Sequence, residues 1–149
     1  MSEYSVEKLK AWLITVNNFQ LCNKILSKKV SKLGLTLAQH EILIILLRDQ
    51  PLSQQELCKK LLVTKGGISV QINKLIETNL VERQADKSDG RISLIKLTAQ
   101  GEALAQQAFE LQKLHVALMF DGLSDEDALA AIASGKTISQ NLSMMEVEK

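Results

Sequence analysis

A pair of helix-start patterns between residues 52 and 64 constrains the fold of this chain more than any other feature. Ser53 and Glu56 have the spacing of a capping box, in which each side chain accepts a hydrogen bond from the other residue's backbone amide. Leu52 and Leu57 flank this box in the positions of a hydrophobic staple. Together they predict a short helix that starts at Ser53 and ends near residue 62.

A second helix is expected after a tight turn. Thr64 can cap it, Lys65 begins it, and Asn79 suits the left-handed position that follows its last turn, near residue 78. Two short helices joined by a tight turn are typical of a helix-turn-helix. The buried stripe of the second helix is expected to consist of Ile68, Ile72 and Leu75.

After this helix the hydrophobic period changes to that of strands. Residues 80–84 and 92–97 are short segments rich in branched side chains, and residues 85–91 between them have charged turn chemistry. This predicts a β-hairpin with a long, charged tip. A hairpin directly after the second helix makes the unit a winged helix.

Helical periodicity dominates the rest of the chain. Further helices are expected over about residues 6–33, 36–49, 98–120 and from 124 onward, the first of them ended by Gly34. Thr36 with Gln39 forms another capping box, and Thr98 and Ser124 can cap the last two helices. The predicted fold is mainly α with a small β-hairpin wing, in a single domain of 149 residues.

Charge is distributed unevenly along a chain whose formal net charge is only +1. Residues 24–98 carry thirteen Lys/Arg against seven Asp/Glu, a net of +6, whereas residues 101–149 carry a net of −5. The basic middle favours a polyanion-binding module over chance clustering on solvated faces. The longest apolar runs have six residues, which is too short to span a bilayer, and the polar start resembles no signal peptide. We therefore expect a cytoplasmic protein without membrane contact.

The second helix of a helix-turn-helix lies in the DNA major groove, so its outward side chains must be small or able to hydrogen-bond. We predict that Asn73 reads adenine, that Lys65 contacts guanine or a phosphate, and that Val70 contacts a thymine methyl. Gly66 and Gly67 each cost about 1 kcal/mol of helix stability relative to alanine. A close approach of the backbone to DNA would explain both, although a frayed helix start explains Gly67 nearly as well.

The remaining predicted contacts are to the DNA backbone and the minor groove. Thr64 and Lys74 sit where side chains usually meet phosphate. In the hairpin tip, which also carries Lys87, Asp89 can pair with Arg91 and fix its direction, which suits a narrow minor groove. The alternative is a solvated charged loop, and the preceding helix-turn-helix favours the DNA contact.

These motifs, in this order, resemble the MarR family of bacterial transcriptional regulators over about residues 6–142. The resemblance rests on the segments 35–39, 61–64, 68–69, 74–76, 79–83, 89–91 and 97–101. The chain departs from the family at Asn79, where glycine is usual, and at Val70, where the residue is often polar, which puts the base-reading pattern in doubt. The residues expected to bind double-stranded DNA are Thr64, Lys65, Gly66, Ser69, Val70, Asn73, Lys74, Arg83, Lys87, Asp89 and Arg91.

The resemblance also implies an obligate homodimer that binds a pseudo-palindromic operator. It divides the chain into a winged-helix DNA-binding lobe (about 36–98) and a helical dimerisation region (about 5–34 and 99–145). The composition of the helices agrees, because their apolar residues exceed what a lobe of about sixty residues can cover. These residues are Trp12, Val16, Phe19, Leu26, Leu104, Ala108, Leu111, Leu118, Leu129, Ile132 and Leu142.

Family members often bind a small phenolic or other ligand, so the resemblance implies a repressor relieved by an effector. The residues expected to line such a pocket are Trp12, Phe19, His40, Phe109 and His115. The sequence indicates no cofactor and no metal site, and the two histidines fit a core or pocket better than a zinc site. A redox role for Cys22 is an alternative to a buried structural cysteine, and Cys58 is read as a core or surface thiol.

Two other classes of function compete with a regulator. An enzyme would need a nucleophile–base pair, a metal cluster or a phosphate loop, and residues 65–67 lack the spacing of such a loop. A winged-helix protein-interaction module without specific DNA binding is the stronger rival. It would bury an apolar face where this sequence places a polar, basic one, so the pattern favours DNA.

Overall fold

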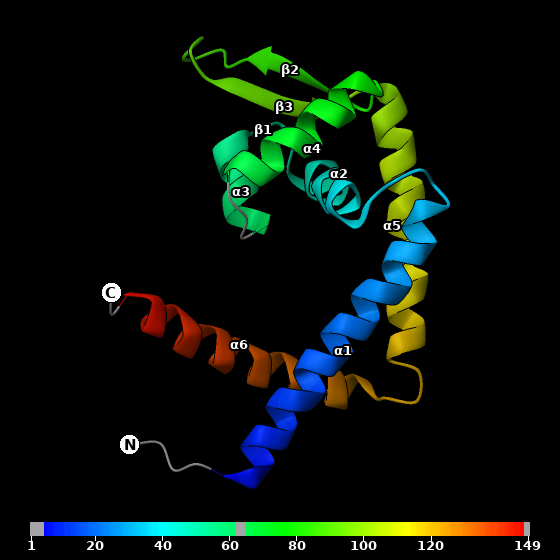
Figure 1. Cartoon of the computed structure of the whole chain (residues 1–149), viewed down its shortest axis with the longest axis vertical. Helices are drawn as coiled ribbons and strands as arrows, with labels where there is room; N and C mark the ends of the chain where they lie inside the picture. The colour runs from blue at the N-terminus through cyan, green and yellow to red at the C-terminus, as the bar shows by residue number, and fades with distance from the viewer. Residues whose placement is uncertain (1–4, 62–64, 148–149) are drawn as a thin grey trace. The chain divides into compact units, whose positions relative to one another are not determined.

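The computed structural model describes residues 5–61 and 65–147 and is mostly helical, with one small antiparallel sheet (Figure 1). The chain divides into two compact units, residues 1–113 and 114–149. The helices are α1 (Val6–Ser31), α2 (Leu37–Asp49), α3 (Gln54–Leu61), α4 (Lys65–Glu77), α5 (Ala99–Met119) and α6 (Asp125–Val147). The strands are β1 (Leu52–Ser53), β2 (Val81–Ala85) and β3 (Ser93–Leu97).

Three of the predicted helix starts, at Thr36, Ser53 and Ser124, are confirmed by reciprocal hydrogen bonds. The Thr36 hydroxyl accepts from the Gln39 amide at 3.2 Å, and the Gln39 side chain accepts from the Thr36 amide at 3.0 Å. At α3 the Glu56 carboxylate accepts from the Ser53 amide at 2.8 Å, and the Ser53 hydroxyl accepts from the Glu56 amide at 3.2 Å. Ser124 is joined in the same way to Asp127 at the start of α6.

Two helices end in the left-handed turns that the sequence predicted. Gly34 after α1 has φ +74° and Asn79 after α4 has φ +56°. At the second turn the Leu80 amide donates to the Leu75 carbonyl and the Asn79 amide to the Ile76 carbonyl, both at 2.9 Å. This is the pair of bonds of a Schellman motif. Asn79 therefore adopts the left-handed conformation that the sequence predicted for it.

The sheet has the order β1–β3–β2, with antiparallel pairing throughout. The hairpin is confirmed, with strands at 81–85 and 93–97 instead of the predicted 80–84 and 92–97. Sequence analysis missed β1, in which Leu52 pairs with Ile95 and Ser53 with Leu94. A two-residue strand has no period of its own, and it exists here because β3 offers it a pairing edge.

The core lies mainly in the winged-helix lobe, with α2 at its centre, and α1 and α5 contribute Leu26, Val30, Ala105 and Ala108 to it. Ile42, Leu43 and Leu46 on α2 are fully enclosed, as an all-round apolar helix requires. The predicted stripe of α4 is buried against the same core, and Ile95 enters it from the sheet. Leu57, the predicted staple residue, is buried with them.

Helix α5 is attached to the lobe through a close backbone contact. A Cβ atom at Gly101 would lie 1.7 Å from the carbonyl oxygen of Leu80, so only glycine fits there. The Thr98 hydroxyl donates to the Asn79 carbonyl at 2.7 Å and accepts from the Gly101 amide at 2.9 Å. These contacts explain the spacing of the Leu-Thr-x-x-Gly pattern at residues 97–101.

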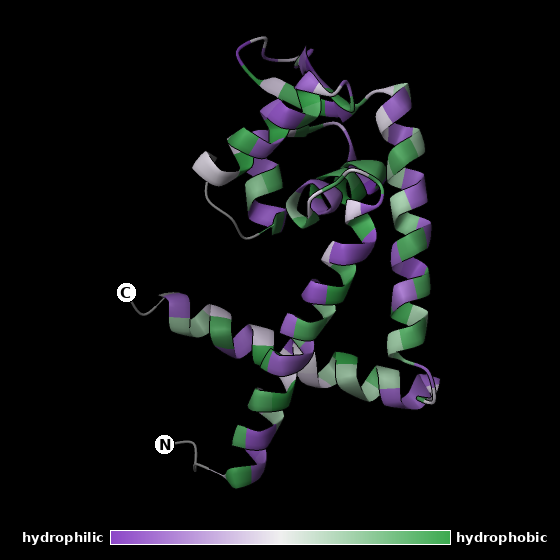
Figure 2. Cartoon of the chain, turned by 45° about the vertical axis from the view of Figure 1, so that its right-hand side comes forward, coloured by the Kyte–Doolittle hydropathy of each residue, from purple (hydrophilic) through white to green (hydrophobic). Residues whose placement is uncertain are grey.

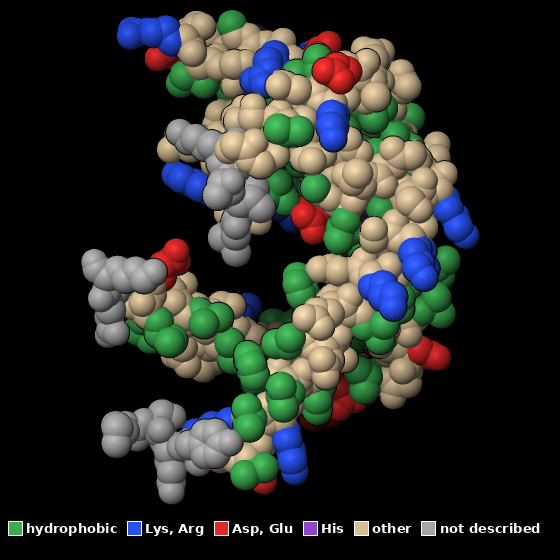
Figure 3. All heavy atoms as spheres, viewed as in Figure 1, with side chains coloured by type: hydrophobic (Ala, Val, Ile, Leu, Met, Phe, Trp, Pro, Cys, Tyr) green, Lys and Arg blue, Asp and Glu red, His purple; other side chains and the backbone are tan. Residues whose placement is uncertain are grey.

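Helix α1 and the second unit, by contrast, leave many large apolar side chains exposed. Hydrophobic and hydrophilic residues alternate along α1 and along α6 (Figure 2), and hydrophobic side chains are visible on the surface of each (Figure 3). No helix in the described part of the chain is long and apolar enough to cross a membrane. The exposed residues include Leu9, Trp12, Leu13, Ile14, Phe19 and Leu21 on α1 and Leu129, Ile132, Ile138, Leu142, Met144 and Met145 on α6.

Candidate nucleic-acid interface

The outward face of α4 consists of small and polar residues, with one apolar exception. Asn73 and Lys74 are exposed and Ser69 is half-buried, while the exception, Val70, is 52% exposed. Gly66 is also exposed, and a Cβ there would meet nothing within 4 Å. The folded chain therefore gives no steric reason for glycine at this position, in contrast to Gly101.

Two predicted DNA contacts, Lys65 and Thr64, lie at the start of α4, where the structure describes little or nothing of them. Lys65 is the first residue of α4, but its side chain is not described. Thr64 lies outside the described residues. The predicted cap and phosphate contact of Thr64 therefore remain predictions.

The wing tip is organised by two aspartates. The Asp86 carboxylate accepts from the backbone amides of Ser88 at 2.7 Å and Asp89 at 3.0 Å, and also from the Ser88 hydroxyl. The Asp89 carboxylate accepts from the Arg91 amide at 3.0 Å and lies 3.5 Å from the Arg91 guanidinium Nε. The predicted Asp89–Arg91 pair is therefore present. The Arg91 side chain is nevertheless 95% exposed, so it can reach a ligand without losing this partner.

Hydrogen bonds to the tip also set its charge. The Ser88 hydroxyl and the amides of Asp89 and Ser88 lower the pKa of Asp86 from its usual value, because they stabilise the carboxylate. Lys87, beside it, is exposed. The tip presents two cations to solvent, while its carboxylates face its own backbone.

Arg83 and Asn73, which the sequence nominated separately, are joined in the structure. The Arg83 Nη2 on β2 donates to the Asn73 Oδ1 on α4 at 3.5 Å. Both side chains are exposed, so the contact lies at the surface between helix and wing. No local pattern predicts such a bond, because the two residues are ten positions apart in different elements.

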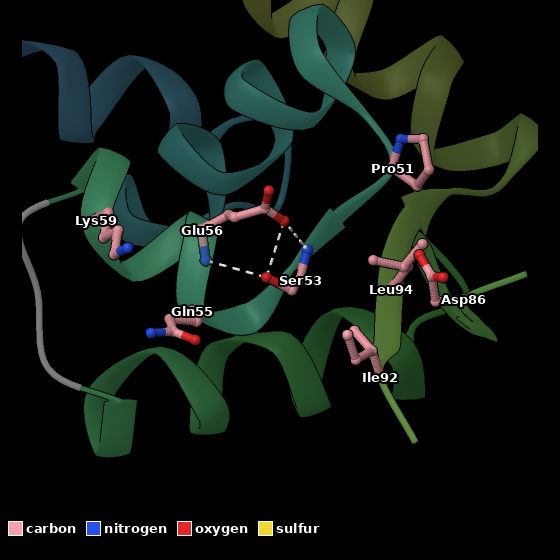
Figure 4. Close-up of a pocket in the computed structure, with 8 residues that line it drawn as sticks. All are labelled: Pro51, Ser53, Gln55, Glu56, Lys59, Asp86, Ile92 and Leu94. Carbon is pink, nitrogen blue, oxygen red and sulfur yellow. Dashed lines mark hydrogen bonds between the residues drawn. The ribbon is translucent and has the colours of Figure 1, made fainter. Parts of the chain in front are cut away.

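Sequence analysis also missed a hollow at the base of the wing, with a volume of about 530 Å³ (Figure 4). Gln55, Glu56 and Lys59 of α3 line it on one side, and Asp86, Ile92 and Leu94 line it on the other. The Glu56 carboxylate in this hollow already has a local partner. It accepts hydrogen bonds from the Ser53 amide and hydroxyl, and these lower the pKa of Glu56. The hollow therefore presents Lys59 and Gln55 as its available donors.

Part of the basic charge of the lobe is compensated internally. The Asp49 carboxylate lies 2.9 Å from Arg48 Nη2 and 3.0 Å from Lys60 Nζ. The hydrogen bonds from Arg48 and then Lys60 hold the pKa of Asp49 at about 2. This cluster ties the end of α2 to α3, and it leaves α4 and the wing tip as the more available cationic surface.

Comparison with known proteins identifies the arrangement. A family model described as MarR family matches residues 33–92, which cover most of the lobe. The multiple antibiotic resistance protein MarR of Escherichia coli is 32% identical over 108 residues, covering 71% of this chain and 75% of that protein. An uncharacterised HTH-type transcriptional regulator of Bacillus cereus is 32% identical over 116 residues, covering 78% of this chain and 77% of the relative. The chain belongs to the MarR family.

Solved structures agree with this assignment. AbsC, a MarR family transcriptional regulator from Streptomyces coelicolor, superposes with a TM-score of 0.85 at 25% identity, covering 96% of this chain and 99% of AbsC. MepR of S. aureus, solved in complex with DNA, shares the fold with a TM-score of 0.77 at 20% identity, covering 93% of this chain and 99% of MepR. The predicted winged-helix fold is confirmed, and this MarR-family protein is a DNA-binding transcriptional regulator.

The residues predicted to line an effector pocket come from α1, α2 and α5, and their grouping into one pocket stays a prediction. Trp12 and Phe19 on α1 are 59% and 66% exposed, and Phe109 on α5 is also exposed, with Lys113 Nζ 5.3 Å from its ring centroid. His115 is buried in the second unit. The cavity at the wing base and the hollow in the second unit are lined by other residues.

His40 is the exception, because it is a buried polar group of the MarR lobe. It is 2% exposed, and neither ring nitrogen has a hydrogen-bond partner of good geometry among the described residues. Burial lowers the pKa of the His40 imidazole, and the nearby backbone of Ala108 on α5 raises it by less. Cys58 is buried on α3, as a structural thiol would be, and Cys22 on α1 is half-buried. No group of three or more metal-ligating side chains occurs within residues 5–61 and 65–147.

Proposed function

We propose that this regulator binds a pseudo-palindromic operator as a homodimer, with α4 in the major groove and the wing tip in the adjacent minor groove of each half-site. The observation that carries the proposal is the combination of a polar outward face on α4 with an exposed Arg91 held by Asp89. Asn73 and Val70 would read base edges, while Lys74, Lys87 and the first turn of α4 would contact phosphates.

The homodimer is proposed from the apolar surface that one chain leaves uncovered. Large apolar residues are exposed along α1 and throughout α6, and a hollow of about 430 Å³ in the second unit is walled by apolar residues. Intertwined helices of two chains would bury this surface. Two-fold symmetry then places the two α4 helices about one DNA turn apart, roughly 34–36 Å. The walls of the hollow are formed by Val116, Phe120, Ala128, Ala131 and Ile132.

In this proposal the protein is a repressor that an effector releases from DNA, and it acts in the cytoplasm without catalysis. A small molecule would act by favouring a lobe spacing that no longer matches the two half-sites. His40 supports an effector contact, because it is a buried polar side chain whose ring nitrogens have no hydrogen bond of good geometry among the described residues.

The test is selection of bound duplexes from a random library at physiological salt. An enriched inverted repeat with half-sites about one turn apart is the expected result. Arg91→Ala should weaken binding to all sequences and reduce the salt slope by about one ion per protomer. Absence of any enriched sequence, with binding only at low salt, would contradict specific recognition and favour the protein-interaction module. The selected operator would then serve to screen small molecules for release.

A further inference from the structure

The alternation of side chains along β2 places Arg83 on the face of the sheet that meets the helices. Arg83 is opposite Ile95, and Val81, two residues earlier, is opposite Leu97. Val81, Ile95 and Leu97 are all buried in the core of the lobe. Because side chains two residues apart on a strand point to the same side, Arg83 projects toward α4.

The outer face of the hairpin carries its charges differently. Glu82 is opposite Lys96, and the Lys96 Nζ lies 2.9 Å from the Glu82 carboxylate. Lys96 is therefore paired across the sheet on the side away from Arg83. It provides a matched cation on the same hairpin, on the face opposite to that of Arg83.

The contact with Arg83 fixes which end of the Asn73 amide is available. The Oδ1 accepts from Arg83 Nη2, so the Nδ2 amide group points away from Arg83. Among the described residues Nδ2 has no acceptor, and Asn73 is exposed. An arginine has five N–H donors and the amide oxygen has two lone pairs, so both side chains can form further hydrogen bonds.

We propose that Arg83 is a positioning residue, which holds the Asn73 amide with its Nδ2 donor free to read a base acceptor. The inference rests on the proposed DNA interface and assigns Arg83 a role within it. The wing strand and α4 then read the base as one unit. The contacted base must present an acceptor in the major groove, as adenine, guanine and thymine do, whereas cytosine presents only a donor.

The experiment compares bound sequences selected by full-length proteins, namely the wild type, Asn73→Ala, Arg83→Met, Arg83→Lys, the double variant Asn73→Ala/Arg83→Met and a control. Methionine keeps an unbranched apolar stem without a donor, while lysine keeps one donor and the charge. Lys96→Met is the matched control, since it removes a cation from the opposite face of the hairpin. Thermal unfolding of each variant reports any general loss of structure.

We expect Asn73→Ala to abolish a preference at one base pair per half-site, where the wild type disfavours cytosine. Arg83→Met should weaken that same preference about two- to tenfold, as the loss of one hydrogen bond predicts. Arg83→Lys should retain more of it, and the double variant should match Asn73→Ala alone. Lys96→Met should leave the preference at this base pair unchanged.

Different failures would lead to different conclusions. If Arg83→Met weakens binding to all sequences equally and lowers the salt slope by about one, Arg83 contacts phosphate and does not position Asn73. If Arg83→Met lowers thermal stability without changing the preference, its role is structural, and the inference is also overturned. If the wild type selects no sequence, or Asn73→Ala changes nothing, the proposed interface itself fails, and the inference fails with it.

Discussion

The winged-helix lobe and helix α6 differ in how far their apolar side chains are exposed. Within residues 36–98 the large apolar side chains described as exposed are Val70 and Ile92, on α4 and at the wing base. Along α6, over residues 125–146, every described side chain is at least partly exposed. The lobe therefore closes its core within one chain, whereas α6 does not.

This difference distinguishes apolar residues that one chain buries by itself from apolar residues that need a partner to be buried. The lobe is specified by contacts that a single chain can make, so its exceptions on the surface indicate function. Val70 lies on the surface proposed to face DNA, and Ile92 lines the hollow at the base of the wing. On α6 the exposed apolar residues extend along the whole helix, and we propose that a second chain covers them.

Replacing Gly101 should break the lobe, and it is the largest effect that we expect. A Cβ at this residue would overlap the Leu80 carbonyl, so α5 or the turn at Asn79 must move. Gly101→Ala should lower the free energy of unfolding by about 3 kcal/mol or more, measured by urea denaturation. Gly135→Ala in α6 is the control, because its Cβ would meet nothing within 4 Å, and it should be neutral or stabilising. Equal effects of the two changes would contradict the close contact.

Placing a charge on the apolar face of α1 should leave the lobe intact but separate the proposed dimer. Phe19→Asp should weaken dimerisation by about 2–4 kcal/mol, measured by analytical ultracentrifugation, since an aromatic that the proposed dimer would bury is replaced by an unpaired carboxylate. Asn17→Asp adds the same charge about 200° around the helix, between Leu13 and Leu21, and so compares two sides of the exposed apolar surface of α1. A Phe19→Asp protein that remains dimeric at the same concentrations would remove this face of α1 from the interface.

Replacing Gly66, unlike replacing Gly101, should stabilise the folded protein. Gly66→Ala should raise the free energy of unfolding by about 0.5–1 kcal/mol, because the site is open and helical. If the α4 backbone approaches DNA there, the same change should weaken operator binding, measured by fluorescence anisotropy. Unchanged affinity would show that a methyl group fits at the interface.

The buried His40 should make the free energy of unfolding depend on pH. Because burial lowers its folded-state pKa below the unfolded value near 6.5, the unfolded state binds the proton more tightly. Its contribution to stability is therefore present above pH 6.5 and is lost as the pH falls toward the lowered pKa. The difference in unfolding free energy between the wild type and His40→Phe should change between pH 7.5 and 5, in the direction that disfavours the wild type at low pH. A constant difference would mean that the pKa of His40 is the same in the folded and unfolded states, which contradicts the lowering by burial.

The sequence predicted those parts of the fold that depend on neighbouring residues. The capping boxes at Thr36 and Ser53 join residues three apart, and the turn at Asn79 depends on the conformation of one residue, so local patterns were sufficient. Strand β1 was missed because its pairing with β3 joins residues more than forty positions apart. The same limit applies to the candidate site, where the Asp89–Arg91 pair was predicted and the Arg83–Asn73 bond was not.

The two aspartates of the wing tip have an entropic consequence. Asp86 and Asp89 hold the backbone of residues 88, 89 and 91 through amide hydrogen bonds before any DNA is present. Ordering one residue of backbone costs about 1–2 kcal/mol of conformational free energy at room temperature. The tip loses this freedom when the chain folds. Less of it then remains to be lost in the proposed minor-groove contact of Arg91, so more of the gross interaction with DNA would be retained as affinity.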